Sequence, residues 1–148
     1  MTDMGARVVA AARGWIGTPY RHQATCRGAG CDCLGLLRGV WREVLGPEPC
    51  SVPAYSRDWA EPASVEALLE AAGAHLEPAG ADRPAPGQVI IFRMRAHGIA
   101  KHVGIQAQVG PDPTFIHAFE RHGVVESPLS APWARRIAGR FRFPERIR

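Results

Sequence analysis

The 148-residue chain lacks any uninterrupted hydrophobic run of the length that a membrane-spanning helix requires, which is about 20 residues. Aromatic residues are scarce at 7%, and Lys101 is the only lysine among 18 basic residues. The net charge of +4 is spread along the chain except in the C-terminal stretch 135–148. Nucleic-acid-binding surfaces combine clustered basic side chains with exposed aromatics or a recognisable motif. We therefore expect no direct binding to a membrane or to nucleic acid.

The first 15 residues lack the features of a secretory signal. They carry Asp3, Arg7 and Arg13 and contain no apolar core followed by a cleavage site. The sequence thus predicts a protein that is made in the cytoplasm without a signal peptide. Disulfides are rare in proteins of that origin, so we expect free thiols. The cysteines concerned are Cys26, Cys31, Cys33 and Cys50.

Hydrophobic spacing predicts one domain, residues 1–148, with a helical first half. Apolar residues recur at helical intervals near 8–16, 34–45 and 65–76, and a proline-broken connection, 48–61, separates the second helix from the third. The first helix is expected to bury Val8, Val9, Ala12, Trp15 and Ile16. The second is expected to bury Leu34, Leu37, Trp41, Val44 and Leu45.

The second half of the chain alternates apolar and polar residues, which is typical of half-buried strands. The gaps between these strands are short and rich in turn residues, which favours antiparallel neighbours. We predict an α+β fold in which N-terminal helices, including the one that follows Asp32, pack on an antiparallel sheet of five to six strands. The expected strands are 88–94, 101–109, 114–120, 123–127 and 137–143.

Cys33 stands at the predicted start of the second helix, because Asp32 is a favourable N-cap residue. Unpaired N–H groups and a partial positive charge at a helix N-terminus stabilise a thiolate. We expect them to lower the pKa of Cys33 and make it a nucleophile. Gly35 and Gly39 keep one side of this helix bare, and we expect a sheet to approach there.

A cysteine nucleophile needs a base and an orienting group. His102 shares a strand face with Gly104, and His117 lies in the middle of the next strand. A hairpin between the two strands would place both histidines side by side on one face, opposite the bare side of the cysteine helix.

Each of these residues also has an ordinary structural explanation. Either histidine can be a hydrogen-bonded residue of the core, and Cys31 fits a small buried filler. A zinc site from Cys26, Cys31, Cys33 and a histidine is the remaining alternative. It lacks the matched second pair of ligands that structural zinc sites use.

Four stretches together resemble the NlpC family of papain-like cell-wall cysteine peptidases. They are "DCLGLL" (32–37), "PGQVIIF" (86–92), "KHVGI" (101–105) and "FIHAFERHGVVES" (115–127), and "WIGTPYRH" (15–22) is similar to a further family segment. The resemblance runs from Ala11 to Phe143. The stretch 28–41, the central insert and "FRFPE" (141–145) look most similar to a phage-tail branch that includes gene transfer agents.

The resemblance implies a papain-like fold and a Cys-His-His triad. Cys33 matches the nucleophile, His102 the base and His117 the orienting residue, while Tyr20 and Asp32 match positions that contact substrate. Leu34 replaces the usual serine, Cys31 replaces an aromatic residue, and "QATCRGAG" replaces a Gly-Gly pair. These departures affect the subsite for the amino group of the substrate.

The implied activity is hydrolysis of an amide bond in peptidoglycan stem peptides, without metal or cofactor. The family usually cleaves between D-glutamate and the diamino acid. The likeness to phage-tail proteins implies tail or hub proteins as partners, a place in a virion or virus-like particle, and action in the periplasm during DNA delivery. Two alternatives stay open: a catalytically silent tail-hub protein of the same fold, and an acyltransferase or amidase that acts on another substrate.

Overall fold

The computed structural model describes residues 3–49, 62–80, 82–93 and 100–145. The helices are α1 (Met4–Arg13), α2 (Cys33–Leu45), α3 (Pro62–His75) and α4 (Ala131–Ala134). The strands are β1 (Thr25–Cys26), β2 (Gly30–Cys31), β3 (Glu77–Ala79), β4 (Val89–Arg93), β5 (Ala100–Gln106), β6 (Thr114–Phe119), β7 (Gly123–Pro128) and β8 (Ile137–Arg142). None of the helices in the described ranges is long and apolar enough to span a bilayer.

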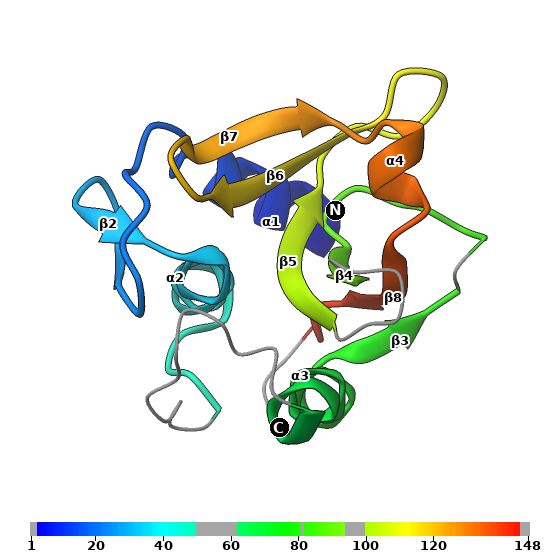
Figure 1. The fold of residues 1–148 in the computed structure, drawn as a ribbon, viewed down its shortest axis with the longest axis horizontal. Coiled ribbons are helices and arrows are strands. Elements are labelled where there is room, and N and C mark those ends of the chain that lie inside the picture. Colours follow the sequence, from blue (N-terminus) through cyan, green and yellow to red (C-terminus); the bar gives the residue numbers. More distant parts are fainter. Residues whose placement is uncertain (1–2, 50–61, 81, 94–99, 146–148) are drawn as a thin grey trace.

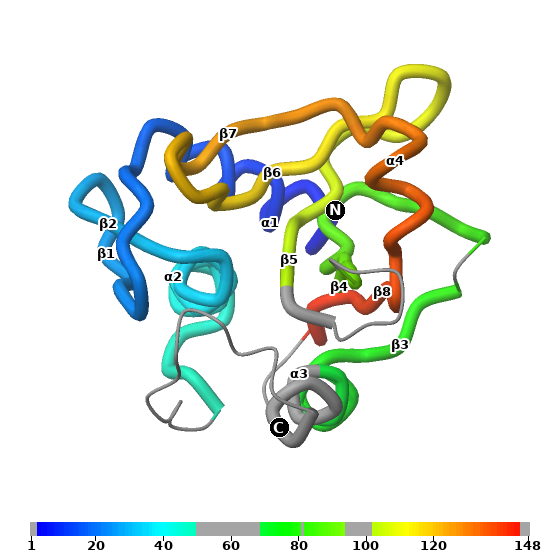
Figure 2. The backbone as a smooth tube through the Cα atoms, viewed as in Figure 1, coloured from blue at the N-terminus to red at the C-terminus, as the bar shows by residue number. Residues whose placement is uncertain are grey.

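The large sheet has six antiparallel strands in the order β3-β8-β4-β5-β6-β7, which confirms the predicted α+β architecture. The five predicted strands correspond to β4 to β8. The sequence pattern missed the edge strand β3, which is three residues long and contains Pro78, a residue tolerated only at sheet edges. It also missed the two-residue strands β1 and β2, whose hairpin leads directly into α2 (Figure 2).

The sheet has a different hydrophobic cluster on each face. Alternate strand residues such as Ile91, Val103 and Ile116 pack with α1, α2 and α3. On the other face, Ile90, Phe92 and Phe115 pack with residues of the β7–β8 connection, which contains α4. Helices α2 and α4 accordingly lie on opposite sides of β5 (Figure 1). The strand periodicity of two therefore assigns each residue to one of two separate environments.

Two of the predicted helix faces need correction. Helix α1 ends at Arg13, so Ile16 leaves the buried stripe and is 45% exposed, whereas Trp15 is buried as predicted. In α2 the fully buried aliphatic residues are Leu36 and Val40, and the predicted face is only half-buried apart from Trp41. Leu34, Leu37 and Trp41 instead line a pocket of about 110 Å³ between α2, α3 and the sheet. Helix α2 thus has two apolar sides.

The two helical glycines do not admit the sheet, so that prediction was wrong. A Cβ atom at Gly35 would collide with the backbone carbonyl of Ala24, and one at Gly39 would collide with the indole of Trp15. Gly35 therefore lets the residues before β1 lie against α2, and Gly39 lets the residue that follows α1 do so. Both glycines serve packing among the N-terminal elements.

We predict that Gly39→Ala destabilises the protein by about 1–3 kcal/mol, the usual cost of overpacking, because the Trp15 ring would have to move. The matched control is Gly73→Ala in α3. A Cβ atom at Gly73 meets no other atom within 4 Å, so helix propensity should make this change stabilising by about 0.5–1 kcal/mol. Urea unfolding followed by circular dichroism measures both. Equal effects of the two substitutions would contradict the packing role of Gly39.

Candidate active site

Cys33 is the first residue of α2, and the carboxylate of Asp32 holds that helix start in place. Asp32 Oδ1 accepts the backbone N–H of Gly35 at 2.7 Å, and Oδ2 accepts that of Gln23 at 2.7 Å. Asp32 is 2% exposed, so its position is fixed by these bonds rather than by solvent. The predicted N-cap is confirmed. Because Oδ2 also binds Gln23, the same carboxylate joins the preceding loop to the helix.

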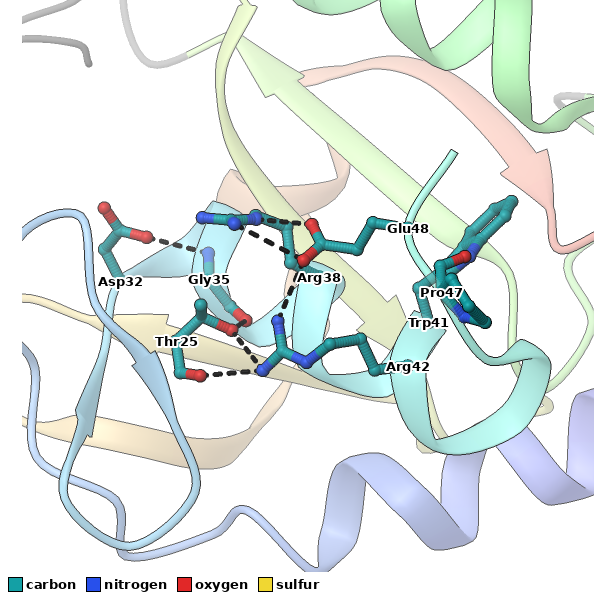
Figure 3. Close-up of polar contacts among 8 residues, drawn as sticks. All are labelled: Thr25, Asp32, Gly35, Arg38, Trp41, Arg42, Pro47 and Glu48. Atoms are coloured by element: carbon teal, nitrogen blue, oxygen red, sulfur yellow. Dashed lines mark hydrogen bonds and ion pairs between the residues drawn. The ribbon is translucent and has the colours of Figure 1, made fainter. Parts of the chain in front are cut away.

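The outer side of α2 is held by a second set of polar contacts (Figure 3). Glu48 accepts hydrogen bonds from Arg38 at 2.6 Å and Arg42 at 3.1 Å. Arg42 also donates to the carbonyl of Thr25 at 2.7 Å, and the Thr25 hydroxyl donates to the carbonyl of Gly35 at 2.6 Å. The β1–β2 hairpin and the residues after α2 are therefore joined across the helix, which restricts how α2 can move.

Burial, followed by the charge of Asp32, raises the pKa of the Cys33 thiol to about 12. The backbone N–H groups of Val103, Leu34 and Cys33 act in the opposite direction, by hydrogen bonding to the sulfur, but they do not outweigh burial. Our expectation that the helix N-terminus lowers this pKa is therefore wrong for the ligand-free protein. Cys33 rests as a neutral thiol at pH 7.

The two candidate histidines are hydrogen-bonded to each other. His102 Nε2 lies 2.8 Å from His117 Nδ1, and both side chains are buried. Strands β5 and β6 pair at Ile105↔Ile116, and continuing that register sets His117 across from Gly104, two residues from His102. The missing side chain at Gly104 leaves room for the ring of Phe115, because a Cβ atom there would lie 2.8 Å from Cδ2 of that ring. The predicted juxtaposition on one sheet face is confirmed.

Aromatic rings surround this histidine pair. The ring centroids of Phe92 and Phe119 lie 5.9 and 6.3 Å from that of His102. Trp133 of α4 lies 5.6 Å from His102 and 5.3 Å from His117. Sequence analysis missed Trp133, because α4 is a single turn with no hydrophobic period, and only its Ser-x-Pro start indicates a helix.

These surroundings lower both histidine pKa values. Burial, followed by the effect of His117, lowers the pKa of His102 to about 3. Burial, followed by the effect of His122, lowers the pKa of His117 to about 4. Both imidazoles are therefore neutral at pH 7, and each ring carries one proton.

The sulfur and the histidines approach strand β5 from different sides. Cys33 belongs to the hydrophobic cluster formed with α1 and α2, which also contains Val103, the residue after His102. The histidines lie among Phe92, Phe115 and Trp133 on the other face. We had expected the histidines to face the glycine side of α2, and that expectation was wrong. Within the described residues, no hydrogen bond joins the Cys33 sulfur to the His102 ring.

The remaining predicted residues lie near the start of α2. Tyr20 forms an isolated parallel bridge with Cys31 and packs against the helical core. Cys31 is a fully buried free thiol, Cys26 is an exposed one, and Cys50 lies outside the described residues. Among residues 3–49, 62–80, 82–93 and 100–145, no group of three or more His, Cys, Asp or Glu residues is arranged to hold a metal ion.

A cysteine at the start of a helix, beside an antiparallel sheet that carries a histidine pair, defines the papain-like class of fold. The model of the NlpC/P60 family matches residues 17–142. The chain belongs to the NlpC/P60 family. No curated protein matches it.

Solved structures share this fold. An NlpC/P60 family protein from Bacillus cereus is similar with a TM-score of 0.65 and 19% identity, over 97% of this chain and 41% of that one. The NlpC/p60 domain of the peptidoglycan hydrolase SagA has a TM-score of 0.58 and 26% identity, over 84% and 89% of the two chains. Ly7917 with the hydrolyzing product of MDP has a TM-score of 0.60 and 13% identity, over 97% and 63%. The chain thus spans about two-fifths of the length of the Bacillus cereus protein.

We predict that acid destabilises the fold through the histidine pair. The folded pKa values of about 3 and 4 lie below the ordinary value of 6.5, so the unfolded chain binds more protons between these limits. The stability that the pair contributes is therefore complete above pH 6.5 and is lost as the pH falls towards 3. Urea unfolding at pH values from 7.5 to 4.5 measures the slope. His117→Asn should make it shallower, and an unchanged slope would contradict the assignment.

Proposed function

We propose that this chain is a cysteine peptidase that hydrolyses an amide bond in the stem peptides of peptidoglycan. The observation that carries the proposal is the placement of Cys33. Cys33 is the first residue of α2 and shares a hydrophobic cluster with Val103 of β5. The residue before Val103, His102, is hydrogen-bonded to His117 at 2.8 Å. The proposed triad is Cys33, His102 and His117, with Cys33 as nucleophile, His102 as base and His117 as orienting residue.

The neutral resting state determines how the reaction starts. His102 accepts the thiol proton as the Cys33 sulfur attacks the substrate carbonyl, which forms a thiolate-derived C–S bond and an imidazolium. Because Nε2 of His102 is engaged by His117, Nδ1 is the nitrogen left to take this proton. Catalytic hydrogen bonds can form only when substrate binds. The proposal therefore requires the Cys33 sulfur and His102 Nδ1 to come within hydrogen-bond distance in the substrate complex.

We propose that the backbone N–H of Cys33, at the start of α2, stabilises the negative oxygen of the tetrahedral intermediate. Collapse of this intermediate breaks the C–N bond, and His102 returns its proton to the leaving amine. Water then attacks the thioester with His102 as base, which releases the carboxylic acid and regenerates the thiol.

Support for peptidoglycan as substrate comes from the family, from SagA, which is named as a peptidoglycan hydrolase, and from Ly7917, which was solved with the hydrolyzing product of MDP. We propose that Tyr20 and Asp32 contribute to substrate binding, as the family resemblance implies. Both carboxylate oxygens of Asp32 already accept backbone N–H groups. In this proposal its negative charge attracts the substrate amine without a direct hydrogen bond. Leu34, which lines the apolar pocket, replaces the serine that normally assists.

We further propose that the protein acts as part of a phage-like tail that opens the cell wall in the periplasm during DNA delivery. The likeness of residues 28–41 and 141–145 to a phage-tail branch supports this proposal. Mass spectrometry of purified particles from the producing cell tests it. Tail or hub peptides that copurify with this chain are the expected result, and its absence from the particles would overturn the proposal.

Zymography on peptidoglycan tests the nucleophile. The wild-type protein should give a cleared band, and Cys33→Ser should reduce clearing by about 10³-fold or more, because the attacking group is lost. Cys31→Ala is the matched control, since Cys31 is a buried free thiol two residues away and should retain most of the activity. An equal loss in both variants would mean that the nucleophile was assigned wrongly. No clearing by the wild-type protein would favour the silent tail-hub protein.

Purified muropeptides test which bond is cut. If the family pattern holds, mass spectrometry should show cleavage between D-glutamate and the diamino acid. Leu34 stands where the family usually has a serine in the subsite for the substrate amino group. We therefore expect the preference for a free N-terminal amine to be weaker in this protein. Leu34→Ser should raise cleavage of free-amine stems relative to blocked ones. Transfer of an acyl group to an added amine, without net hydrolysis, would favour the acyltransferase alternative.

A further inference from the structure

The hydrogen bond between His102 and His117 is part of a longer network that includes a third residue. His117 Nε2 lies 3.0 Å from the hydroxyl oxygen of Ser127 on β7. Strands β6 and β7 pair at Phe115↔Ser127, so Ser127 is on the same sheet face as His117. Side chains from three adjacent strands, β5, β6 and β7, therefore form one chain of polar atoms through the aromatic cluster.

The two hydrogen bonds among Ser127, His117 and His102 can be donated in either of two directions. Only one of them leaves His102 able to accept a proton. If Ser127 accepts the N–H of His117 Nε2, then His117 Nδ1 is an acceptor and takes the N–H of His102 Nε2. His102 Nδ1 is then unprotonated. In the reverse direction Ser127 donates, His117 Nδ1 donates to His102 Nε2, and the proton of His102 sits on Nδ1. That arrangement cannot take a proton from Cys33.

The surroundings offer His117 Nε2 few other partners. The rings of Phe115, Phe119 and Trp133 pack around it and provide no acceptor oxygen. The neighbouring Glu126 points its carboxylate to Arg13 at 3.0 Å and to the Thr114 hydroxyl at 2.7 Å. Of the described side chains, Ser127 is the hydrogen-bond partner of this nitrogen, at 3.0 Å.

We propose that Ser127 is a positioning residue: its hydroxyl accepts the His117 Nε2–H and so holds both histidines in the tautomer that leaves His102 Nδ1 free. This inference rests on the proposed hydrolase function and extends it by one residue. When His102 becomes protonated, the same bonds remain in place, since His117 Nδ1 continues to accept the Nε2–H. No reorientation of either ring is then needed during the reaction.

The tautomers can be read without any substrate. Two-bond ¹H–¹⁵N correlation spectra of histidine-labelled protein at pH 7.5 should show the proton on Nε2 in both His102 and His117. In Ser127→Ala, His117 should lose this single tautomer. A proton on Nδ1 of His117 in the wild-type protein would overturn the proposal, whatever the activity.

Kinetics on muropeptides give the second measurement. Ser127→Ala should lower kcat about 10- to 100-fold, part of the roughly 10²- to 10⁴-fold contribution of acid–base catalysis, and change KM less than about threefold. Ser127→Thr keeps the hydroxyl and should restore both the spectrum and kcat. Ser130→Ala is the control, because Ser130 is an exposed serine whose side chain makes no cap bond to α4. Wild-type kcat and spectra in Ser127→Ala would overturn the proposal.

The two hypotheses fail in different ways. If the wild-type protein cleaves no wall substrate but shows the expected tautomers, the hydrolase proposal fails and the positioning role of Ser127 in the histidine pair stands. If the wild-type protein is active and Ser127→Ala is as active and keeps its tautomers, the hydrolase proposal stands and the role of Ser127 is wrong. Thermal unfolding of each variant verifies that it is folded.

Discussion

The position of the reactive sulfur depends on one buried carboxylate. Asp32 caps α2 and at the same time binds the backbone of Gln23, so one carboxylate joins the helix to the loop before it. Gln23 has a φ of 62°, a conformation that non-glycine residues rarely adopt, and the bond to Asp32 offsets part of that cost. The contacts of Arg42 and Glu48 then fix the helix from its outer side.

The helix N-terminus and burial act in opposite directions on the pKa of the Cys33 thiol, and the larger effect determines the resting state. A helix N-terminus stabilises a charge by up to about 2 kcal/mol, which corresponds to roughly one to one and a half pKa units. Burial shifts the pKa of a fully enclosed group by up to about 3–5 units. Cys33 is only 6% exposed, so burial wins and the resting thiol is neutral. A substrate that displaces the apolar surroundings with polar groups changes this balance.

The sequence was sufficient to predict features whose cause is local. Asp32 as N-cap, the strands with period two and the meeting of His102 and His117 all follow from residues near each other in the chain. The misses depend on distant contacts. Gly39 is required by Trp15, which lies in the turn after α1, and Trp133 reaches the histidines from a single-turn helix. The direction of the Cys33 pKa shift was missed because burial is a property of the whole fold.

Helix α4 limits how substrate and water can reach the proposed catalytic residues. Trp133 closes the histidine side of β5, and both Cys33 and His102 are more than nine-tenths buried. For a hydrolase of the proposed kind, the scissile bond and the later water would both have to reach atoms that are enclosed in the ligand-free protein. A leaving amine that stays beside the acyl-enzyme could then attack the thioester before water does and re-form the amide bond.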